Sequence, residues 1–430
     1  MKLESYQTIV NGQLQHDGLS YQYLAETYGT PLYIFDETTF VQRVKDYKEA
    51  LSNPYFETEV LFASKALLTK AMGQLVAQLG IGQDVVSAGE IYTAVASGVN
   101  PSKLYFHGNN KLNDELLYAI EQGVGTIVLD NRSEASRLNK LLLDLGKKQR
   151  VLLRLNPGVE AHTHEYIKTA HNDSKFGESV FDPAIEDVIQ TINNYPTLDL
   201  AGFHCHIGSQ VFEEQSFLDS ATEMIEFSKK MEDNLNLKVK EINFGGGFGV
   251  YYTAEDKPFD IKAFLPKFIQ HVHETSQKLS LTLEKVTIEP GRALVNQSGS
   301  TLYRVGDLKT TTSGKNYLFV DGGMTDNIRP ALYQAKYEAL ITNKADEVAD
   351  TVYTIAGKAC ESGDKIINDY PLPEAETGDL LLVNGTGAYN YTMSSHYNRI
   401  PKPAMIHVLN GKSRLTVKRE TFADMMRNEI

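Results

Sequence analysis

The chain has 430 residues and a formal net charge of −13, and 42% of its residues are hydrophobic and 23% charged. This length predicts two domains, and the composition is that of a soluble globular protein. The acidic balance argues against nucleic acid and anionic membrane as partners, and no apolar run approaches the roughly 18 residues of a membrane span. The first residues lack the apolar core of a signal peptide, and two cysteines make no disulfide framework. We therefore expect a cytoplasmic protein with free thiols.

Short strands and turns are expected over residues 1–36, an N-terminal arm. From there to about residue 290, apolar strands alternate with amphipathic helices. Eight strands are predicted, at residues 60–63, 84–87, 104–107, 126–129, 151–155, 201–206, 241–244 and 286–289. Helices are expected between them, for example at residues 112–122, 133–145, 183–193, 217–233 and 261–279. This alternation predicts a (β/α)8 barrel. The alternative, a doubly wound open sheet, usually carries a Gly-rich turn after its first strand, and none follows Ala63.

After about residue 290 the pattern changes to strands without intervening helices. They are predicted at residues 301–305, 316–320, 351–355, 379–383, 405–409 and 414–418, separated by turn signals such as Asn410-Gly411. This texture predicts an all-β sandwich or barrel domain that the N-terminal arm joins. The predicted division is residues 1–36 for the arm, 37–285 for the barrel and 286–430 for the β domain.

Lys65 stands where the apolar run Val60–Ala63 ends and a helical pattern begins at Leu67. A lysine there cannot easily reach water. Two interpretations are open. One is an ion pair with a carboxylate, and the other is a desolvated amine with a lowered pKa, ready to form a Schiff base.

Barrel enzymes place their sites at the carboxyl ends of the strands. Strand seven runs into Gly245-Gly246-Gly247-Phe248-Gly249, and Gly291-Arg292 follow strand eight. Glycines let backbone N–H groups close on a phosphate, and barrels commonly bind phosphate after these two strands. The sequence therefore predicts a phosphate site, with a tight turn of small residues as the alternative. The run matches no nucleotide-binding motif.

Glu289 ends the eighth strand, where a buried carboxylate requires a cationic partner. A pyridinium nitrogen is one such partner, because an acidic residue beside it keeps it protonated. A salt bridge with Arg292 is the other.

His204 and His206 flank Cys205, so both imidazoles lie on one face of their strand. They suit stacking on a cofactor ring or, with ligands such as His162 and His164, a metal-dependent hydrolase. The chain lacks an obvious third and fourth ligand cluster, so we expect no metal.

A lysine for a Schiff base, a phosphate cradle and an acid for a pyridinium nitrogen together specify pyridoxal phosphate. Over nearly its whole length the sequence resembles the barrel-fold (fold-type III) pyridoxal-phosphate-dependent decarboxylases. The motifs that carry the resemblance are residues 62–66, 84–90, 173–177, 202–209, 245–249, 289–292 and 360–364. Small departures are Ala88, where the family often has glycine, and Lys358-Ala359 before the Cys-Glu motif.

The resemblance implies a role for each matching residue. Lys65 holds pyridoxal 5'-phosphate, His204 stacks on its ring and Glu289 pairs with the ring nitrogen. The other residues expected at the cofactor are Ser209, Gly246, Gly247, Pro290, Gly291, Arg292 and Tyr389. Cys360 returns a proton to the substrate and, with Glu361, reaches the partner's cofactor in a homodimer with shared active sites.

The resemblance also implies the substrate, which is meso-2,6-diaminopimelate, converted to L-lysine and CO2 in the last step of lysine biosynthesis. Its second amino-acid end calls for arginine, whose fork matches a carboxylate. Arg329 and Tyr333 are expected on the distal carboxylate with help from Arg292 and Tyr389, and Glu361 on the distal ammonium. The alternative for Arg329 is an exposed loop arginine. Two other classes are open, a racemase on the same barrel, whose family lacks the Cys-Glu motif, and a cofactor-free regulatory homologue.

Overall fold

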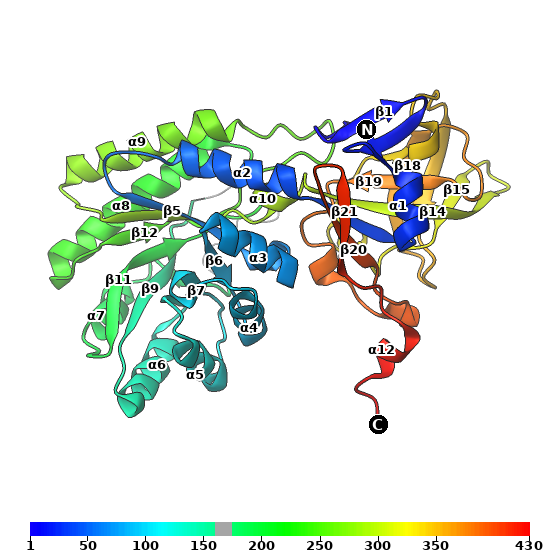
Figure 1. The fold of residues 1–430 in the computed structure, drawn as a ribbon. Helices are drawn as coiled ribbons and strands as arrows, with labels where there is room; N and C mark the ends of the chain where they lie inside the picture. The colour runs from blue at the N-terminus through cyan, green and yellow to red at the C-terminus, as the bar shows by residue number, and fades with distance from the viewer. Residues whose placement is uncertain (160–173) are drawn as a thin grey trace. The chain divides into compact units, whose positions relative to one another are not determined.

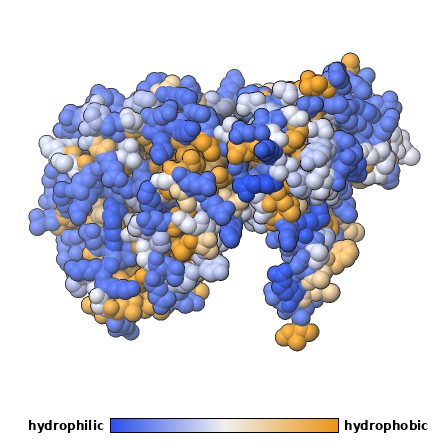
Figure 2. Space-filling view, in the orientation of Figure 1, coloured by the Kyte–Doolittle hydropathy of each residue, from blue (hydrophilic) through white to orange (hydrophobic). Residues whose placement is uncertain are grey.

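In a computed structural model, the structure describes residues 1–159 and 174–430 (Figure 1). They form two compact units. One unit consists of Val44–Gly249 and Pro258–Ala293, and the other of Met1–Arg43, Val250–Lys257 and Leu294–Ile430. Within the described part of the chain, no helix is long and apolar enough to cross a membrane. Figure 2 shows hydrophilic residues over most of the visible surface, with hydrophobic residues in smaller patches.

The first unit contains the predicted (β/α)8 barrel, which is confirmed (Figure 1). Its parallel strands are β5 (Glu57–Ala63), β6 (Gly82–Val85), β7 (Leu104–Phe106), β8 (Thr126–Leu129), β9 (Gln149–Asn156), β11 (Leu198–Cys205), β12 (Glu241–Asn243) and β13 (Lys285–Ile288). Each of these pairs with the next, and β13 pairs with β5, which closes the cylinder. A short strand, β10 (Glu178–Ser179), adds to β9.

Helices connect the strands of the barrel. They are α3 (Lys70–Leu79), α4 (Ala88–Ala96), α5 (Asn113–Gln122), α6 (Arg132–Leu145), α7 (Ile185–Asn193), α8 (Glu214–Leu235) and α9 (Ile261–Leu279), and α2 (Glu37–Ala50) precedes β5. Local sequence sets several of their ends. The side chains of Thr69, Ser87 and Asn131 accept backbone N–H groups at the starts of α3, α4 and α6. Gly80 and Gly146 end α3 and α6 in the left-handed conformation.

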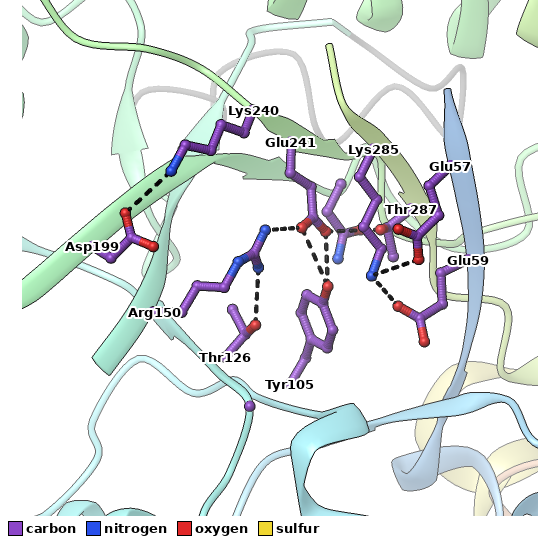
Figure 3. Close-up of polar contacts among 12 residues, drawn as sticks. Glu57, Glu59, Tyr105, Thr126, Arg150, Asp199, Lys240, Glu241, Lys285 and Thr287 are labelled. Atoms are coloured by element: carbon purple, nitrogen blue, oxygen red, sulfur yellow. Dashed lines mark hydrogen bonds and ion pairs between the residues drawn. The ribbon is translucent and has the colours of Figure 1, made fainter. Parts of the chain in front are cut away.

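The amino ends of the strands enclose a buried polar network (Figure 3). Its centre is Glu241, which is fully buried and accepts hydrogen bonds from Tyr105 at 2.9 Å, Thr287 at 2.7 Å and Arg150 at 2.5 Å. Lys285 lies beside it and pairs with a glutamate of β5. Because barrel enzymes keep their chemistry at the opposite end, this network belongs to the stability of the barrel.

The second unit contains the predicted β domain. Its longest strand is β14 (Gly299–Thr310), and the others are β15 (Asn316–Val320), β16 (Ala339–Ile341), β17 (Thr351–Ala356), β18 (Lys365–Leu372), β19 (Leu380–Asn384), β20 (Ala404–Leu409) and β21 (Lys412–Val417). From the N-terminal arm, β4 (Leu32–Asp36) inserts between β14 and β20, as expected of an arm that joins this domain. The arm also supplies β1 (Gln7–Val10), β2 (Gln13–His16), β3 (Leu19–Ser20) and α1 (Tyr21–Tyr28).

Several features of this unit differ from the expectation. The short strand β16 was not predicted, and the arm contains the helix α1 besides its strands and turns. Strand β18 was not predicted either, because Asn368, Asp369 and Pro371 break its apolar pattern, and it forms an edge of the sheet where proline is tolerated. The unit also contains short helices, α11 (Arg329–Tyr333) and α12 (Phe422–Met426), in addition to its strands. Another, α10 (Arg292–Val295), follows β13.

Candidate active site

Lys65 lies in a 3-10 turn, Ser64–Ala66, at the carboxyl end of β5. Lys65 is exposed, whereas Ser64 and Ala66 on either side are buried. The expectation of a lysine shielded from water is therefore wrong, because the turn carries the chain over the end of the strand and α3 begins only after its cap at Thr69. An exposed amine at the mouth of a barrel is accessible to a carbonyl compound.

Glu289 follows β13 and is buried, and three side chains hold its carboxylate. His107 Nε2 lies 2.7 Å from Oε1, and Asn243 Nδ2 donates to the same oxygen at 2.7 Å. His204 Nε2 lies 3.1 Å from Oε2. The rings of His107 and His204 meet edge to face, with their centroids 4.7 Å apart. Glu289 and its three partners come from the ends of four different strands, so they meet only because the barrel is closed.

The electrostatics of this cluster favour an ionised carboxylate. Burial raises the pKa of Glu289, but the two histidines outweigh burial and hold that pKa well below its usual range. Burial lowers the pKa of His204 to about 4, although Glu289 acts in the opposite direction. A buried, ionised and hydrogen-bonded carboxylate suits a pyridinium nitrogen.

The glycines after β12 and β13 are required by close approach. A Cβ on Gly246 would lie 2.2 Å from the carbonyl oxygen of Glu289, and one on Gly247 2.3 Å from that of Gly208. Gly247 also has a φ of 109°, which disfavours other residues. A Cβ on Gly291 would lie 2.9 Å from Ala63 Cβ. Close packing therefore requires small residues in this run, as the tight-turn interpretation expects. The same glycines present backbone rather than side chains at this end of the barrel.

Two residues expected at a phosphate lie together beside these glycines. Arg292 Nη2 donates a hydrogen bond to Ser209 Oγ at 3.1 Å. His206 is close by, and its Nδ1 accepts the backbone N–H of Gly246 at 3.3 Å. A cation, a hydroxyl and glycine backbone form the donor set that a phosphate prefers.

The histidine pair that suggested a metal does not converge on one point, since His204 contacts Glu289 and His206 contacts the glycine run. Among residues 1–159 and 174–430, one group of three ligating side chains lies within 4.8 Å, namely His107, His204 and Glu289. In this structure both histidines contact the carboxylate of Glu289 through Nε2. His162 and His164 lie outside the described residues.

Sequence reasoning missed His107 and Asn243 as site residues. Both follow or end short strands, and His107 was included in a predicted strand without a role. The available signal was periodicity, because Tyr105 and His107 lie two apart and face the same side of β7. Asp84 on β6 was also missed; it is buried with Oδ1 lacking a hydrogen-bond partner, and burial raises its pKa.

Arg329 is not the exposed loop residue of the alternative interpretation. It begins α11 and is only 6% exposed. Its Nη1 donates to the hydroxyls of Tyr252 at 2.8 Å and Tyr337 at 2.7 Å, and its guanidinium lies 4.9 Å and 5.8 Å from the two ring centroids. Tyr333, at the end of the same helix, is exposed. Two tyrosine hydroxyls thus fix the buried guanidinium of Arg329, whereas Tyr333 is exposed to solvent.

Cys360 is exposed, whereas Cys205 is buried. The backbone N–H of Cys360 donates to Asn398 Oδ1 at 2.7 Å. The carboxylate of Asp364 accepts the N–H groups of Met324 at 2.7 Å and Ala359 at 2.8 Å, which ties the loop that carries the thiol to the turn before α11. The loop therefore has a defined backbone and a free thiol.

Tyr389 has a φ of 64°, which is unusual for a residue with a side chain. Strained backbone of this kind is frequent at functional sites. The predicted site residues are thus divided between the units: Lys65, His204, Ser209, Gly246, Gly247, Glu289, Pro290, Gly291 and Arg292 belong to the barrel, and Arg329, Tyr333, Cys360, Glu361 and Tyr389 to the β unit. Their individual roles stay predictions.

Comparison with known proteins agrees with this chemistry. The family model "Pyridoxal-dependent decarboxylase, pyridoxal binding domain" matches residues 37–296. The chain is 45% identical over 420 residues to diaminopimelate decarboxylase of Bacillus subtilis, which covers 98% of this chain and 96% of the relative. It is 39% identical to diaminopimelate decarboxylase of Staphylococcus aureus, over 97% of this chain and 98% of the relative.

A solved structure of diaminopimelate decarboxylase from M. jannaschii with L-lysine is similar, with a TM-score of 0.92 and 31% identity, covering 99% of this chain and 98% of that one. A lysine/ornithine decarboxylase from Vibrio vulnificus, 20% identical with a TM-score of 0.75 over 90% of this chain and 97% of that one, shares the fold. The chain therefore belongs to the pyridoxal-dependent decarboxylases, in the family of the diaminopimelate decarboxylases.

Proposed function

We propose that this chain decarboxylates meso-2,6-diaminopimelate to L-lysine and CO2 with pyridoxal 5'-phosphate as cofactor, the last step of lysine biosynthesis. The observation that carries the proposal is the buried Glu289 carboxylate, held by two histidines and an asparagine, in a barrel whose mouth holds an exposed Lys65. Relatives of 45% and 39% identity that are named for this reaction support it, as does a similar structure with L-lysine, the product, bound.

The barrel residues fit the cofactor. When bound, pyridoxal phosphate supplies an electron sink for the electron pair that remains on the substrate after CO2 leaves. Glu289 would keep the ring nitrogen protonated. His204, whose Nδ1 is buried without a hydrogen-bond partner, would stack on the ring. The residues that would surround the rest of the cofactor are Ser209, Gly246, Gly247, Pro290, Gly291, Arg292 and Tyr389.

Two residues handle bonds and protons. Lys65 Nζ is the group that would hold the cofactor covalently, because its amine lies exposed at the carboxyl end of β5. The thiol of Cys360 returns a proton to the carbon that lost CO2. Its exposure and its ordered backbone support this role.

The distal end of the substrate distinguishes diaminopimelate from simpler amino acids. Arg329 binds the distal carboxylate, with Tyr333, Arg292 and Tyr389 contributing, and Glu361 binds the distal ammonium. A guanidinium already fixed by two tyrosine hydroxyls loses little freedom on binding, which supports Arg329 in this role.

The working form is a homodimer with shared active sites, in which Cys360 and Glu361 of one subunit serve the cofactor of the other. The support is the family resemblance and the need to exclude water from the reacting carbon. The acidic composition suits an enzyme of the cytoplasm with a small-molecule substrate and no nucleic acid or membrane partner.

The test is to incubate the purified protein and pyridoxal phosphate with meso-diaminopimelate, lysine, ornithine and arginine in parallel and to measure CO2 and the amine products. We expect diaminopimelate to react far faster than the others. Release of CO2 from ornithine at a higher rate would make the protein a diamine-forming decarboxylase. An altered substrate stereocentre without CO2 would make it a racemase.

A further inference from the structure

Strand β7 contributes to both ends of the barrel interior. Near its start, Tyr105 donates a hydrogen bond to the buried carboxylate of Glu241 at 2.9 Å (Figure 3). Two residues later, His107 contacts the buried carboxylate of Glu289 at 2.7 Å. The two side chains lie on one face of the strand because they are two residues apart. One strand thus supports a glutamate at the amino end and another at the carboxyl end, where barrel enzymes hold their chemistry.

His107 is placed to act on Glu289. His107 is 5% exposed to solvent and Glu289 is 7% exposed, so their contact is shielded from water. A carboxylate can only accept hydrogen bonds, so Nε2 of His107 carries the proton. A second donor, Asn243, shares Oε1 and itself accepts the backbone N–H of Gly245 at 2.9 Å. Oε1 of Glu289 is therefore held by two donors, His107 and Asn243, each of which lies at the carboxyl end of a barrel strand.

The environment gives this contact more than a packing role. Besides His107, the charged and titratable groups that interact with Glu289 are Asp84 from β6, Arg154 from β9, and His204, Cys205 and His206 at the end of β11. Lys65, from the turn after β5, acts on Asp84. His204 is the residue that would stack on the cofactor ring. His107, in contrast, has no expected contact with the face of the cofactor ring, so its contact with Glu289 is the role left to explain.

We propose that His107 is a positioning residue for the decarboxylation, which orients Glu289 and keeps its carboxylate ionised toward the nitrogen of the cofactor ring. The inference rests on the proposed function. Tyr105 makes the equivalent contact at the opposite end of the barrel and serves stability alone, so the same strand supplies a matched control.

The experiment compares three His107 variants and one control in the full-length protein. His107→Phe removes the donor, His107→Asn leaves an amide too short to reach, and His107→Gln restores a donor near the position of Nε2. Tyr105→Phe removes a hydrogen bond to a buried carboxylate far from the ring. The measurements are the dissociation constant for pyridoxal phosphate, the visible absorption of the bound cofactor against pH, kcat and KM, and thermal melting without cofactor.

For His107→Phe and His107→Asn we expect cofactor affinity and kcat to fall about tenfold to a hundredfold, the range of one charge-assisted hydrogen bond. The acid limb of the absorption and rate profiles should move to higher pH, because Glu289 becomes easier to protonate. His107→Gln should recover most of both. Tyr105→Phe should melt earlier but keep the affinity, the spectrum and the rates.

A double variant shows whether His107 acts through Glu289. In a Glu289→Gln background, the further change His107→Asn should have little additional effect on affinity or kcat. Additive losses would overturn the inference, as would His107 variants that melt early but keep wild-type affinity and pH profile. Wild-type protein that binds no pyridoxal phosphate, or a Glu289→Gln variant that behaves as wild type, would overturn the proposed function and the inference with it.

Discussion

Replacement of Arg329 by alanine should remove the preference for a substrate with a distal carboxylate. In the structure the guanidinium is only 6% exposed and is fixed by the hydroxyls of Tyr252 and Tyr337 at 2.8 Å and 2.7 Å. The alanine variant would leave the carboxylate of diaminopimelate without its cationic partner. A buried charge pair that loses one member costs about 2–5 kcal/mol, so kcat/KM for diaminopimelate should fall about 30-fold to several thousandfold.

The assay compares diaminopimelate with L-lysine, which lacks the distal carboxylate. Weak decarboxylation of lysine should change little in Arg329→Ala, so the ratio of the two kcat/KM values should fall by nearly the full factor. Arg329→Lys should recover part of it, because a lysine keeps the charge without the bidentate fork. Tyr337→Phe is the milder variant, since it removes one hydrogen bond from the guanidinium and should cost about 1 kcal/mol.

Stability must be measured alongside, because Arg329 is also a packing residue. Its loss removes one hydrogen bond from each of two buried tyrosine hydroxyls and a packed side chain, so Arg329→Ala should unfold at lower urea concentration. The kinetics should be measured well below that midpoint. Equal losses for diaminopimelate and lysine would refute the reasoning, since they would show that the arginine supports the fold and not the distal carboxylate.

The remaining predictions concern the two units separately and the pH dependence of folding. Lys65→Ala should fold normally but lose nearly all turnover and the borohydride-reducible link to the cofactor; a retained link would show that another lysine is used. Lys65→Ala and Cys360→Ala should each be nearly inactive, and co-expression should restore substantial activity in hybrid dimers; proven hybrids without recovery would rule out shared sites. Arg150→Met should lower the free energy of unfolding by about 2–4 kcal/mol, because the fully buried Glu241 loses its cation, while kcat of the folded enzyme stays unchanged; urea titration and kinetics check both. The pKa of His204 is lowered from 6.5 to about 4 in the folded chain, so between pH 6.5 and 4 the unfolded chain binds more protons and the free energy of unfolding should fall as the pH drops. In the cofactor-free protein, His204→Gln should make the free energy of unfolding less dependent on pH in this range. An unchanged slope would contradict the assignment.

The sequence was sufficient for the strands of the barrel and their order. Most barrel strands contain a short apolar run and are bounded by helices, several of which have their own caps, such as Asn131 at α6, and these signals are local. Periodicity therefore predicted all eight strands and the barrel, and the loss of helical patterns after about residue 290 predicted the β domain. Motifs around Lys65, Glu289 and Cys360 were also contiguous in sequence, which made the family resemblance visible.

The tertiary structure alone decided which side chains meet and which are exposed. His107 and Glu289 are 182 residues apart and come into contact only because the barrel closes. Arg329 is buried because Tyr252, from a distant part of the chain, packs on it. Lys65 is exposed because a turn of three residues lifts it off the strand, although its apolar neighbours predicted burial. Local periodicity records whether a segment is a strand or a helix, but pairing across a closed sheet depends on contacts between residues that no local pattern connects.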